Sequence, residues 1–155
     1  MGKRKAVTDL LENSKCGAFL AGTQLESVDN EKVEVSVATK KHSLITSGEC
    51  HFLIKNIWKR EEDTYYIVRT VNGNEIKITA QQSLLTGTGW KRAKNLKPGD
   101  RLLCYDFFIG RHYQELLSVE KVVAEEQIVY SVSLGNRTLI ANGFVCSDYD
   151  MQQGS

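Results

Sequence analysis

Alternation of apolar and polar residues is the pattern that most constrains how this chain can fold. Val33, Val35 and Val37 alternate with polar residues in "KVEVSVA", and the stretch "TYYIVRTV" is rich in aromatic and β-branched side chains. A period of two places successive side chains on opposite faces of a strand. A single proline interrupts the 155 residues. The sequence therefore predicts that strands dominate from Phe19 onward.

Short segments that contain glycine mark turns between the predicted strands. "NGN" at residues 72–74 separates "YYIVRTV" from "EIKIT", and "LGN" at residues 134–136 separates "IVYSVSL" from "RTLIA". Both predict hairpins, because Asn and Gly adopt positive φ at low cost. "KPGD" has Pro98 and Gly99 at the centre of a turn that leads into the apolar strand "RLLCY". With a short helix expected over residues 6–13, the pattern predicts an all-β domain of about a dozen strands.

Length and charge limit the compartment and the partners. The 155 residues suffice for one domain with a real core and are too few for two ordinary domains. The 20 basic and 19 acidic side chains leave a net charge of +1, so no global field attracts nucleic acid. No apolar run approaches the length of a membrane span, and no signal-peptide pattern is found. We therefore expect a monomer in the cytoplasm, with neither a membrane nor a nucleic-acid partner.

Segments in three parts of the chain carry a resemblance to a known family. They are "FLAGTQL" at residues 19–25, "ITAQQSLLTGTGW" with "AKNLKPGDRLL", and "VYSVSLGNRTLIANGF". In this order and at this spacing they resemble the opening motif, the threonine-and-histidine motif and the closing motif of the Hint family. That family comprises inteins, bacterial intein-like domains and hedgehog autoprocessing domains. The resemblance implies a Hint fold with pseudo-two-fold character over residues 18–148, with residues 1–17 and 149–155 as flanking, extein-like segments.

The resemblance implies chemistry on the protein's own backbone, with the flanking segments as its partners and with no cofactor. In the family, a Cys or Ser at the first position attacks the carbonyl that precedes it. The Thr and His of the second motif polarise that amide and donate a proton to the leaving nitrogen. A penultimate His then helps a terminal Asn to cyclise, which cuts the downstream bond. This is nucleophilic catalysis with a positioned general acid.

Most positions that carry this chemistry hold other residues here. Ala18 stands at the place of the first nucleophile and has no group that can attack. Thr79 is kept, but Gln82 stands where the motif has its histidine, and an amide cannot exchange a proton near neutral pH. The other substituted positions are Ser131 for Asp and Arg137 for His in the closing motif, Ser147 and Asp148 for the final His and Asn, and Tyr149 for the Cys, Ser or Thr that follows the junction in splicing inteins.

These substitutions leave three functions open. The first is an intein-like domain that derives from autocatalytic splicing or cleavage and is attenuated or inactive. Natural divergence explains the number of changed positions better than deliberate trapping of a precursor does. The second is a non-catalytic scaffold or protein-binding module that keeps the fold and holds the segments before Ala18 and after Asp148 together. The third is an active intein with a non-standard nucleophile.

Several side chains are candidates for that non-standard nucleophile. Ser131 falls where one class of inteins has a catalytic Cys, with a Trp in the second motif that Trp90 resembles. The simpler interpretation is that Ser131 is a surface strand residue and Trp90 a core or rim aromatic, because a serine without a histidine base is a poor nucleophile. Asp148 could attack the next carbonyl when protonated, so any cleavage there is expected to be slow and favoured by acid.

The cysteines add two more candidates. Cys16 and Cys146 each lie close before a junction, so in a fold that brings its ends together they are expected neighbours, available for a disulfide or as substitute thiol nucleophiles. Cys50 and Cys104 stand among apolar residues and are expected in the core. The four cysteines form no CxxC pair, which argues against a zinc site. An unrelated β-barrel binder, suggested by "WKR" at residues 58–60 and 90–92, is the remaining alternative.

Overall fold

The computed structural model describes residues 16–38 and 43–153, and the helix expected over residues 6–13 lies outside them. The strands in this described part are β1 (Phe19–Leu20), β2 (Gln24–Glu26), β3 (Lys32–Glu34), β4 (Leu44–Thr46), β5 (His51–Leu53), β6 (Asn56–Thr70), β7 (Glu75–Ile78), β8 (Ser83–Thr86), β9 (Gly89–Arg92), β10 (Arg101–Asp106), β11 (Gly110–Ser133), β12 (Thr138–Ala141) and β13 (Phe144–Ser147). The helices in the same residues are the 3₁₀ helices η1 (Val28–Asn30) and η2 (Ala93–Asn95) and the α-helix α2 (Tyr149–Gln153). The prediction of an all-β domain is confirmed.

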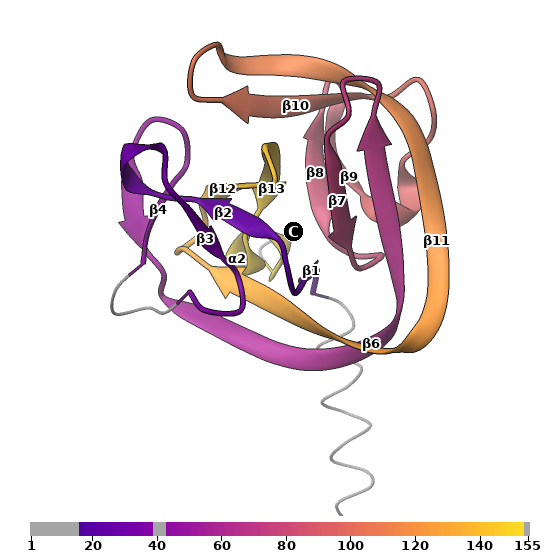
Figure 1. The fold of residues 1–155 in the computed structure, drawn as a ribbon, viewed down its shortest axis with the longest axis horizontal. Coiled ribbons are helices and arrows are strands. Elements are labelled where there is room, and N and C mark those ends of the chain that lie inside the picture. Colours follow the sequence, from indigo (N-terminus) through magenta and orange to yellow (C-terminus); the bar gives the residue numbers. More distant parts are fainter. Residues whose placement is uncertain (1–15, 39–42, 154–155) are drawn as a thin grey trace, which may run out of the picture.

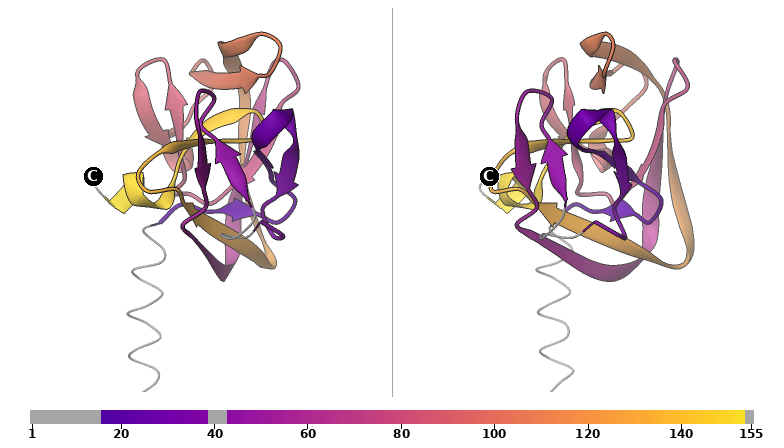
Figure 2. Two further views of the ribbon diagram at one scale, coloured as in Figure 1. Left: turned by 90° about the vertical axis from the view of Figure 1, so that its left-hand side faces the viewer. Right: turned by 60° about the vertical axis from the view of Figure 1, so that its left-hand side comes forward.

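Two long antiparallel strands, β6 and β11, frame the molecule. In Figure 1 they curve together around the shorter strands. Their pairing shifts register between Leu116 and Ser118 and again between Val123 and Gln127, and such bulges bend and twist a strand. The main sheet follows the order β1-β7-β6-β11-β10-β8-β13-β12-β2-β3, with β9 beside β8, while β4 and β5 form a separate pair. Figure 2 shows α2 at the edge of the molecule, beyond the strands.

One large cluster of apolar side chains fills the space that these strands enclose. Its largest fully buried members are Phe19, Phe144, Leu25, Ile45, Ile54, Ile76, Ile78, Leu84, Leu102, Leu134 and Leu139. The alternation seen in the sequence accounts for this packing, since in β7 the residues Ile76 and Ile78 are buried and their neighbours Glu75 and Lys77 are exposed. Phe19 fixes the start of the chain's first strand in this core, which positions the residues just before it.

Two of the predicted turns form as expected. The chain turns between β6 and β7 at residues 71–74, where Gly73 has φ +93°. In "KPGD" the N–H of Asp100 donates to the carbonyl of Lys97 over 3.1 Å, and Gly99 has φ +98°, as a turn with glycine at its third position requires.

Two other local predictions are wrong. Residues 134–136 do not form a hairpin, because β12 pairs with β13 and β2 and not with β11. Gly135 and Asn136 do adopt positive φ, but the backbone N–H groups of this segment are bound by carboxylates from the end of the chain. Of the two cysteines expected in the core, Cys104 is there and Cys50 is exposed in the turn between β4 and β5. Apolar neighbours in the sequence do not bury a residue that lies at a turn.

Candidate functional site

The peptide bond between Gly17 and Ala18 is held by hydrogen bonds on both sides. The N–H of Ala18 donates to Thr79 Oγ1 over 2.9 Å, and Ser131 Oγ donates to the carbonyl of Gly17 over 2.8 Å. The pairing of β1 with β7 and β11 explains this arrangement, because Thr79 directly follows β7 and Ser131 lies in β11. A hydrogen bond to a carbonyl oxygen draws electrons from its carbon. The bond is therefore both positioned and polarised.

Neither Ala18 nor Ser131 is equipped to attack this bond. Ala18 is completely buried and presents only a methyl group. Ser131 uses its proton toward the Gly17 carbonyl and accepts a hydrogen bond from Arg60 Nη1 over 3.1 Å. A hydroxyl that faces a guanidinium has no base to take its proton, so Ser131 is placed as a donor to an oxyanion and not as an activated nucleophile. Ser131 is 2% exposed, so its interpretation as a surface residue is wrong.

Arg60 is a residue of this site that the sequence analysis missed. Besides Ser131, its guanidinium donates from Nη2 to the carbonyl of Cys16 over 2.9 Å and pairs through Nε with Glu62 at 3.0 Å. Arg60 and Ser131 thus bind two consecutive carbonyls of the chain before Ala18. Arg60 reaches the site through the pairing of β6 with β11. In the sequence it belongs to the charged run "KREED" of this strand, which does not distinguish it from a solvated arginine.

The side chain of Gln82 bonds to the end of β13 and not to the Gly17–Ala18 bond. Its Nε2 donates to the carbonyls of Ser147 and Ser83 over 3.0 and 3.1 Å and lies 3.3 Å from Ser147 Oγ. Both Gln82 and Ser147 are buried. The amide cannot carry a proton to a leaving nitrogen at neutral pH. Gln82 therefore joins the start of β8 to the end of β13 and supplies no acid.

Asp148 is built into the fold as an acceptor of backbone hydrogen bonds. Its Oδ1 accepts from the N–H of Met151 over 2.9 Å, which caps the start of α2. Its Oδ2 accepts from the N–H groups of Leu134 and Asn136 over 2.8 and 3.0 Å. Attack by this carboxyl on its own carbonyl requires at least one of these bonds to break. The role that the structure supports for Asp148 is therefore to hold α2 against residues 134–136.

Arg137 and Tyr149, the two remaining predicted positions, contact other parts of the fold. Arg137 donates from Nη1 to the carbonyls of Leu134 and Gly135, each over 3.1 Å, and stacks over the ring of Phe52 at 4.0 Å. The ring of Tyr149 lies against that of Trp58, with 4.2 Å between the ring centroids. Arg137 braces a turn, and Tyr149 anchors α2.

The cysteines do not form the disulfide that the sequence left open, since all four are free thiols. Burial raises the pKa of the Cys146 thiol well above its ordinary value, and the neighbouring Cys104 raises it further. Burial also raises the pKa of Cys104 to about 12. Because the thiolate is the nucleophilic form, Cys146 is an inert core thiol. The thiol that acts on Cys146 electrostatically is that of Cys104.

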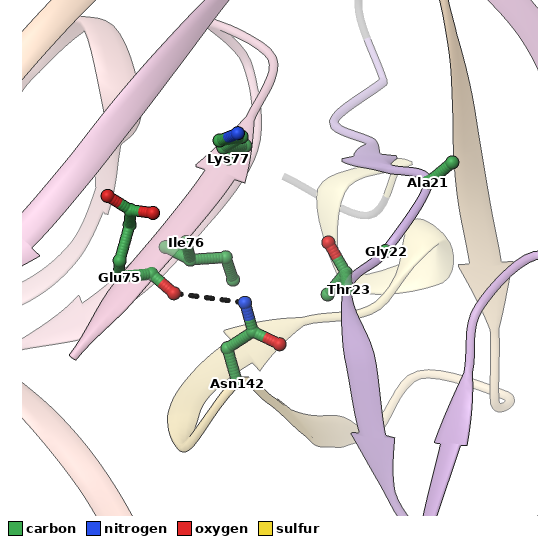
Figure 3. A pocket seen from close by; sticks show the side chains of 7 residues that line it. All are labelled: Ala21, Gly22, Thr23, Glu75, Ile76, Lys77 and Asn142. Atoms are coloured by element: carbon green, nitrogen blue, oxygen red, sulfur yellow. Dashed lines mark hydrogen bonds between the residues drawn. The ribbon is translucent and has the colours of Figure 1, made fainter.

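A polar pocket of about 200 Å³ is lined by none of the residues that bind the Gly17–Ala18 bond (Figure 3). Asn142 lines the pocket, and its Nδ2 donates to the carbonyl of Glu75 over 2.9 Å. This hydrogen bond connects the turn after β12 to β7. The pocket wall offers Glu75 and Lys77 but no thiol, histidine or paired carboxylates. Residues 16–38 and 43–153 contain no group of His, Cys, Asp and Glu arranged to hold a metal ion, and no helix among them is long and apolar enough to span a bilayer.

Comparisons with known proteins connect this geometry to one fold. No protein-family model and no curated protein matches the sequence. Solved structures do match: the DnaB intein of Synechocystis sp. PCC 6803 has a TM-score of 0.74 at 17% identity, covering 85% of this chain and 98% of that chain. The TvoVMA intein has a TM-score of 0.71 at 15% identity, covering 84% and 96%. The gp41-1 intein has a TM-score of 0.67 at 23% identity, covering 84% and 97%.

These likenesses concern the fold, and they extend over nearly the whole of each intein. The all-β architecture that the motifs implied is confirmed, while the pseudo-two-fold character stays a prediction. The chain therefore has the Hint fold of the inteins.

Proposed function

We propose that this chain is an intein-derived Hint domain that has kept the frame of its upstream junction and has lost the groups that cut it. The observation that carries the proposal is the Gly17–Ala18 bond. Thr79 and Ser131 bind its two sides, and a methyl group stands at the place of the family's nucleophile. Hydrogen-bond donors and acceptors can position an amide, but without a nucleophile they do not open it.

A domain of this kind acts as a scaffold that holds its two flanking segments side by side. Gln152 supports this role, because its Oε1 accepts from the N–H of Gly17 over 2.7 Å while its Nε2 donates to the carbonyl of Asp148 over 3.1 Å. The partners are then the segments before Ala18 and after Asp148. The four free thiols suit a reducing compartment such as the cytoplasm.

A second candidate function rests on the position of Ser131, whose Oγ is 2.8 Å from the carbonyl oxygen of Gly17. In this route Oγ adds to the Gly17 carbonyl carbon, the bond to the Ala18 nitrogen breaks, and the serine proton passes to that nitrogen. The product is an ester on Ser131 and a free amino group on Ala18. Arg60 donates to Oγ and cannot take its proton. We favour the first function for this reason.

The test places folded reporter proteins before Met1 and after Ser155 and follows the product sizes by gel electrophoresis, at neutral and mildly acidic pH, with and without a thiol. We expect one unchanged precursor under all conditions. A free reporter or a ligated pair would overturn the proposal. If Ser131→Ala then abolished the product, the second candidate would be correct. If Ser131→Ala left it unchanged, Cys16→Ser and Asp148→Ala would be tested next.

A further inference from the structure

The short helix after the downstream junction is tied firmly to the body of the domain. Asp148 caps it and binds residues 134–136, as described above. Asp150 adds a second carboxylate, which accepts from Ser133 Oγ and, over 2.9 Å, from the N–H of Gly135. Tyr149 stacks on Trp58. Because both carboxylates and the ring are anchored, the backbone of α2 presents the side chain of Gln152 in a defined place.

That place is next to the residue before the upstream junction. Gln152 accepts from the N–H of Gly17 over 2.7 Å, and its other end donates to the carbonyl of Asp148 over 3.1 Å. The second bond orients the amide, because the carbonyl of Asp148 requires the NH₂ group on its side. The oxygen of Gln152 must then face Gly17. One side chain therefore recognises a backbone donor from the opposite end of the domain.

The same spot leaves no room for a side chain at position 17. A Cβ built on Gly17 would lie 2.7 Å from the backbone N of Gln82 and 2.5 Å from Gln152 Oε1, and it would also strike the Cα of Gln82. Gln82 cannot yield, because its own backbone N–H donates to Thr79 and its carbonyl accepts from Ala93. Position 17 therefore requires glycine because a Cβ would clash there, and not because the backbone has a positive φ.

We propose that α2 and the backbone of Gln82 form a subsite that accepts only glycine in the residue before the upstream junction, with Gln152 as the residue that binds its N–H. The ligand is an extended peptide of the form X-Gly-Ala. Arg60 binds the carbonyl of X, and Ser131 binds the carbonyl of the glycine. The segment that follows the domain thereby selects the sequence that precedes it. This proposal rests on the proposed function, in which the domain holds both flanks.

The experiment measures amide hydrogen exchange by NMR in the full chain and compares Gln152→Ala with the control Gln127→Ala. Gln127 is a half-buried glutamine far from both flanking segments in the sequence, and its side chain bonds to the nearby carbonyl of Glu125. We expect the exchange of the Gly17 amide to rise about tenfold in Gln152→Ala and to stay unchanged in Gln127→Ala. Gln152→Glu keeps an oxygen that accepts from the Gly17 N–H and loses only the donor to the carbonyl of Asp148, so its Gly17 amide should exchange more slowly than that of Gln152→Ala. Unchanged exchange of Gly17 in Gln152→Ala would overturn the role of Gln152.

Selection of glycine is tested with Gly17→Ala against Gly87→Ala, since a Cβ at Gly87 meets nothing within 4 Å. We expect Gly17→Ala to lose protection at the amides of residues 17 and 18 while core amides such as that of Ile76 stay protected, which separates displacement of the segment from unfolding. Gly87→Ala should change neither. Retained protection in Gly17→Ala would contradict the subsite. These readouts are independent of cleavage, so a domain that cut itself would refute the proposed function without deciding the subsite.

Discussion

Under the proposed function the domain has two junctions, the Gly17–Ala18 and Asp148–Tyr149 bonds, and their surroundings differ. At the upstream junction, the Gly17–Ala18 bond lies between Thr79 Oγ1 and Ser131 Oγ, while Ala18 supplies no attacking group and Gln82 no acid. At the downstream junction, Asp148 is part of the framework, where its carboxylate binds three backbone N–H groups. The upstream bond is held by hydrogen bonds but has no nucleophile at position 18. The residues of the downstream junction stabilise the fold. Few substitutions should therefore restore chemistry upstream, whereas changes downstream should affect stability.

The largest effect is expected when the upstream reagents are put back. Ala18→Cys together with Gln82→His adds a thiol next to the Gly17 carbonyl and, beside the backbone of Gly17, an imidazole that supplies a proton to the leaving nitrogen once it turns away from Ser147. We predict cleavage after Gly17 on addition of a small thiol, seen as two fragments by mass spectrometry, where the parent shows none. Adding Thr79→Ala should reduce this cleavage, since the Ala18 N–H then loses its partner. A folded double variant that stays intact would mean that Thr79 and Ser131 do not position the bond for attack.

At the downstream junction, Asp148→Ala should destabilise the fold. It removes the cap of α2 and leaves the buried N–H of Leu134 without its acceptor, whereas the exposed N–H of Asn136 keeps its bond to Asp150. A cap contributes about 1 kcal/mol, and an unsatisfied buried donor costs about 1–3 kcal/mol. We predict a loss of about 3 kcal/mol in the free energy of unfolding, or a Tm lower by about 6–12 °C for a domain of this size.

The matched control for this prediction is Asp63→Ala. Asp63 is an exposed aspartate that accepts only from the hydroxyl of its neighbour Thr64, so its loss should leave the Tm nearly unchanged. Equal Tm values for the two variants would contradict a structural role for Asp148. Asp148→Asn should fall between Asp148→Ala and the parent, because the amide keeps one acceptor oxygen and turns a donor toward backbone N–H groups.

A smaller effect is expected where the two junctions meet through Gln82. Gln82→Leu removes the donor to the carbonyls of Ser147, which is buried, and of Ser83, which is half-buried. We predict a loss of about 1–3 kcal/mol in the free energy of unfolding, measured by urea denaturation. Gln127→Leu, at the half-buried glutamine that bonds to a single nearby carbonyl, serves as the reference and should change little. If both variants unfold at the same urea concentration, the bond from Gln82 to Ser147 does not stabilise the fold.

The smallest effect concerns the thiols in the core near the downstream junction. Burial raises the pKa of Cys146 well above its ordinary value and that of Cys104 to about 12, so both thiols stay neutral at pH 8 in the folded state. We predict that iodoacetamide labels exposed Cys50 and leaves Cys104 and Cys146 unlabelled until urea unfolds the chain. Rapid labelling of Cys146 in the native protein would reopen its candidacy as a nucleophile.

The same pKa shifts set the sign of a pH effect. In the unfolded chain the thiols ionise above their ordinary pKa of about 8.5, whereas in the folded chain they remain protonated. Their contribution to stability is therefore complete below that pH and is lost as the pH rises. The Tm should fall above about pH 8.5, and Cys104→Ala should make this fall shallower.

The sequence predicted the fold where local chemistry decides it. The turns at Gly73 and Gly99 follow from residues that accept positive φ, and the buried face of β7 follows from alternation. The hairpin at residues 134–136 was predicted wrongly because the same residue types also form a turn whose N–H groups bind carboxylates. Asp148 and Asp150 lie more than ten residues further along the chain, so the local pattern does not reveal them.

The site was predictable only as far as the motifs extend. Thr79 and Ser131 were found through the resemblance, and the structure brings both to the Gly17–Ala18 bond. Arg60 and Gln152 were missed, because they reach Cys16 and Gly17 from 44 and 135 residues away in the sequence. Such contacts arise from the wrapping of β6 with β11 and from the fold of α2, and no spacing in the sequence encodes them.

An acyl group transferred from Gly17 would be trapped by hydroxylamine, which opens esters and thioesters. The unsubstituted chain would be incubated with hydroxylamine at neutral pH, and its mass would be followed over days beside that of Ser131→Ala. We expect the parent to keep a single, unchanged mass, since neither Ala18 nor Ser131 is equipped to attack the Gly17 carbonyl. A fragment that ends at Gly17 as its hydroxamate, absent from Ser131→Ala, would identify Ser131 as a working nucleophile and refute the proposal that the domain has lost the groups that cut this bond.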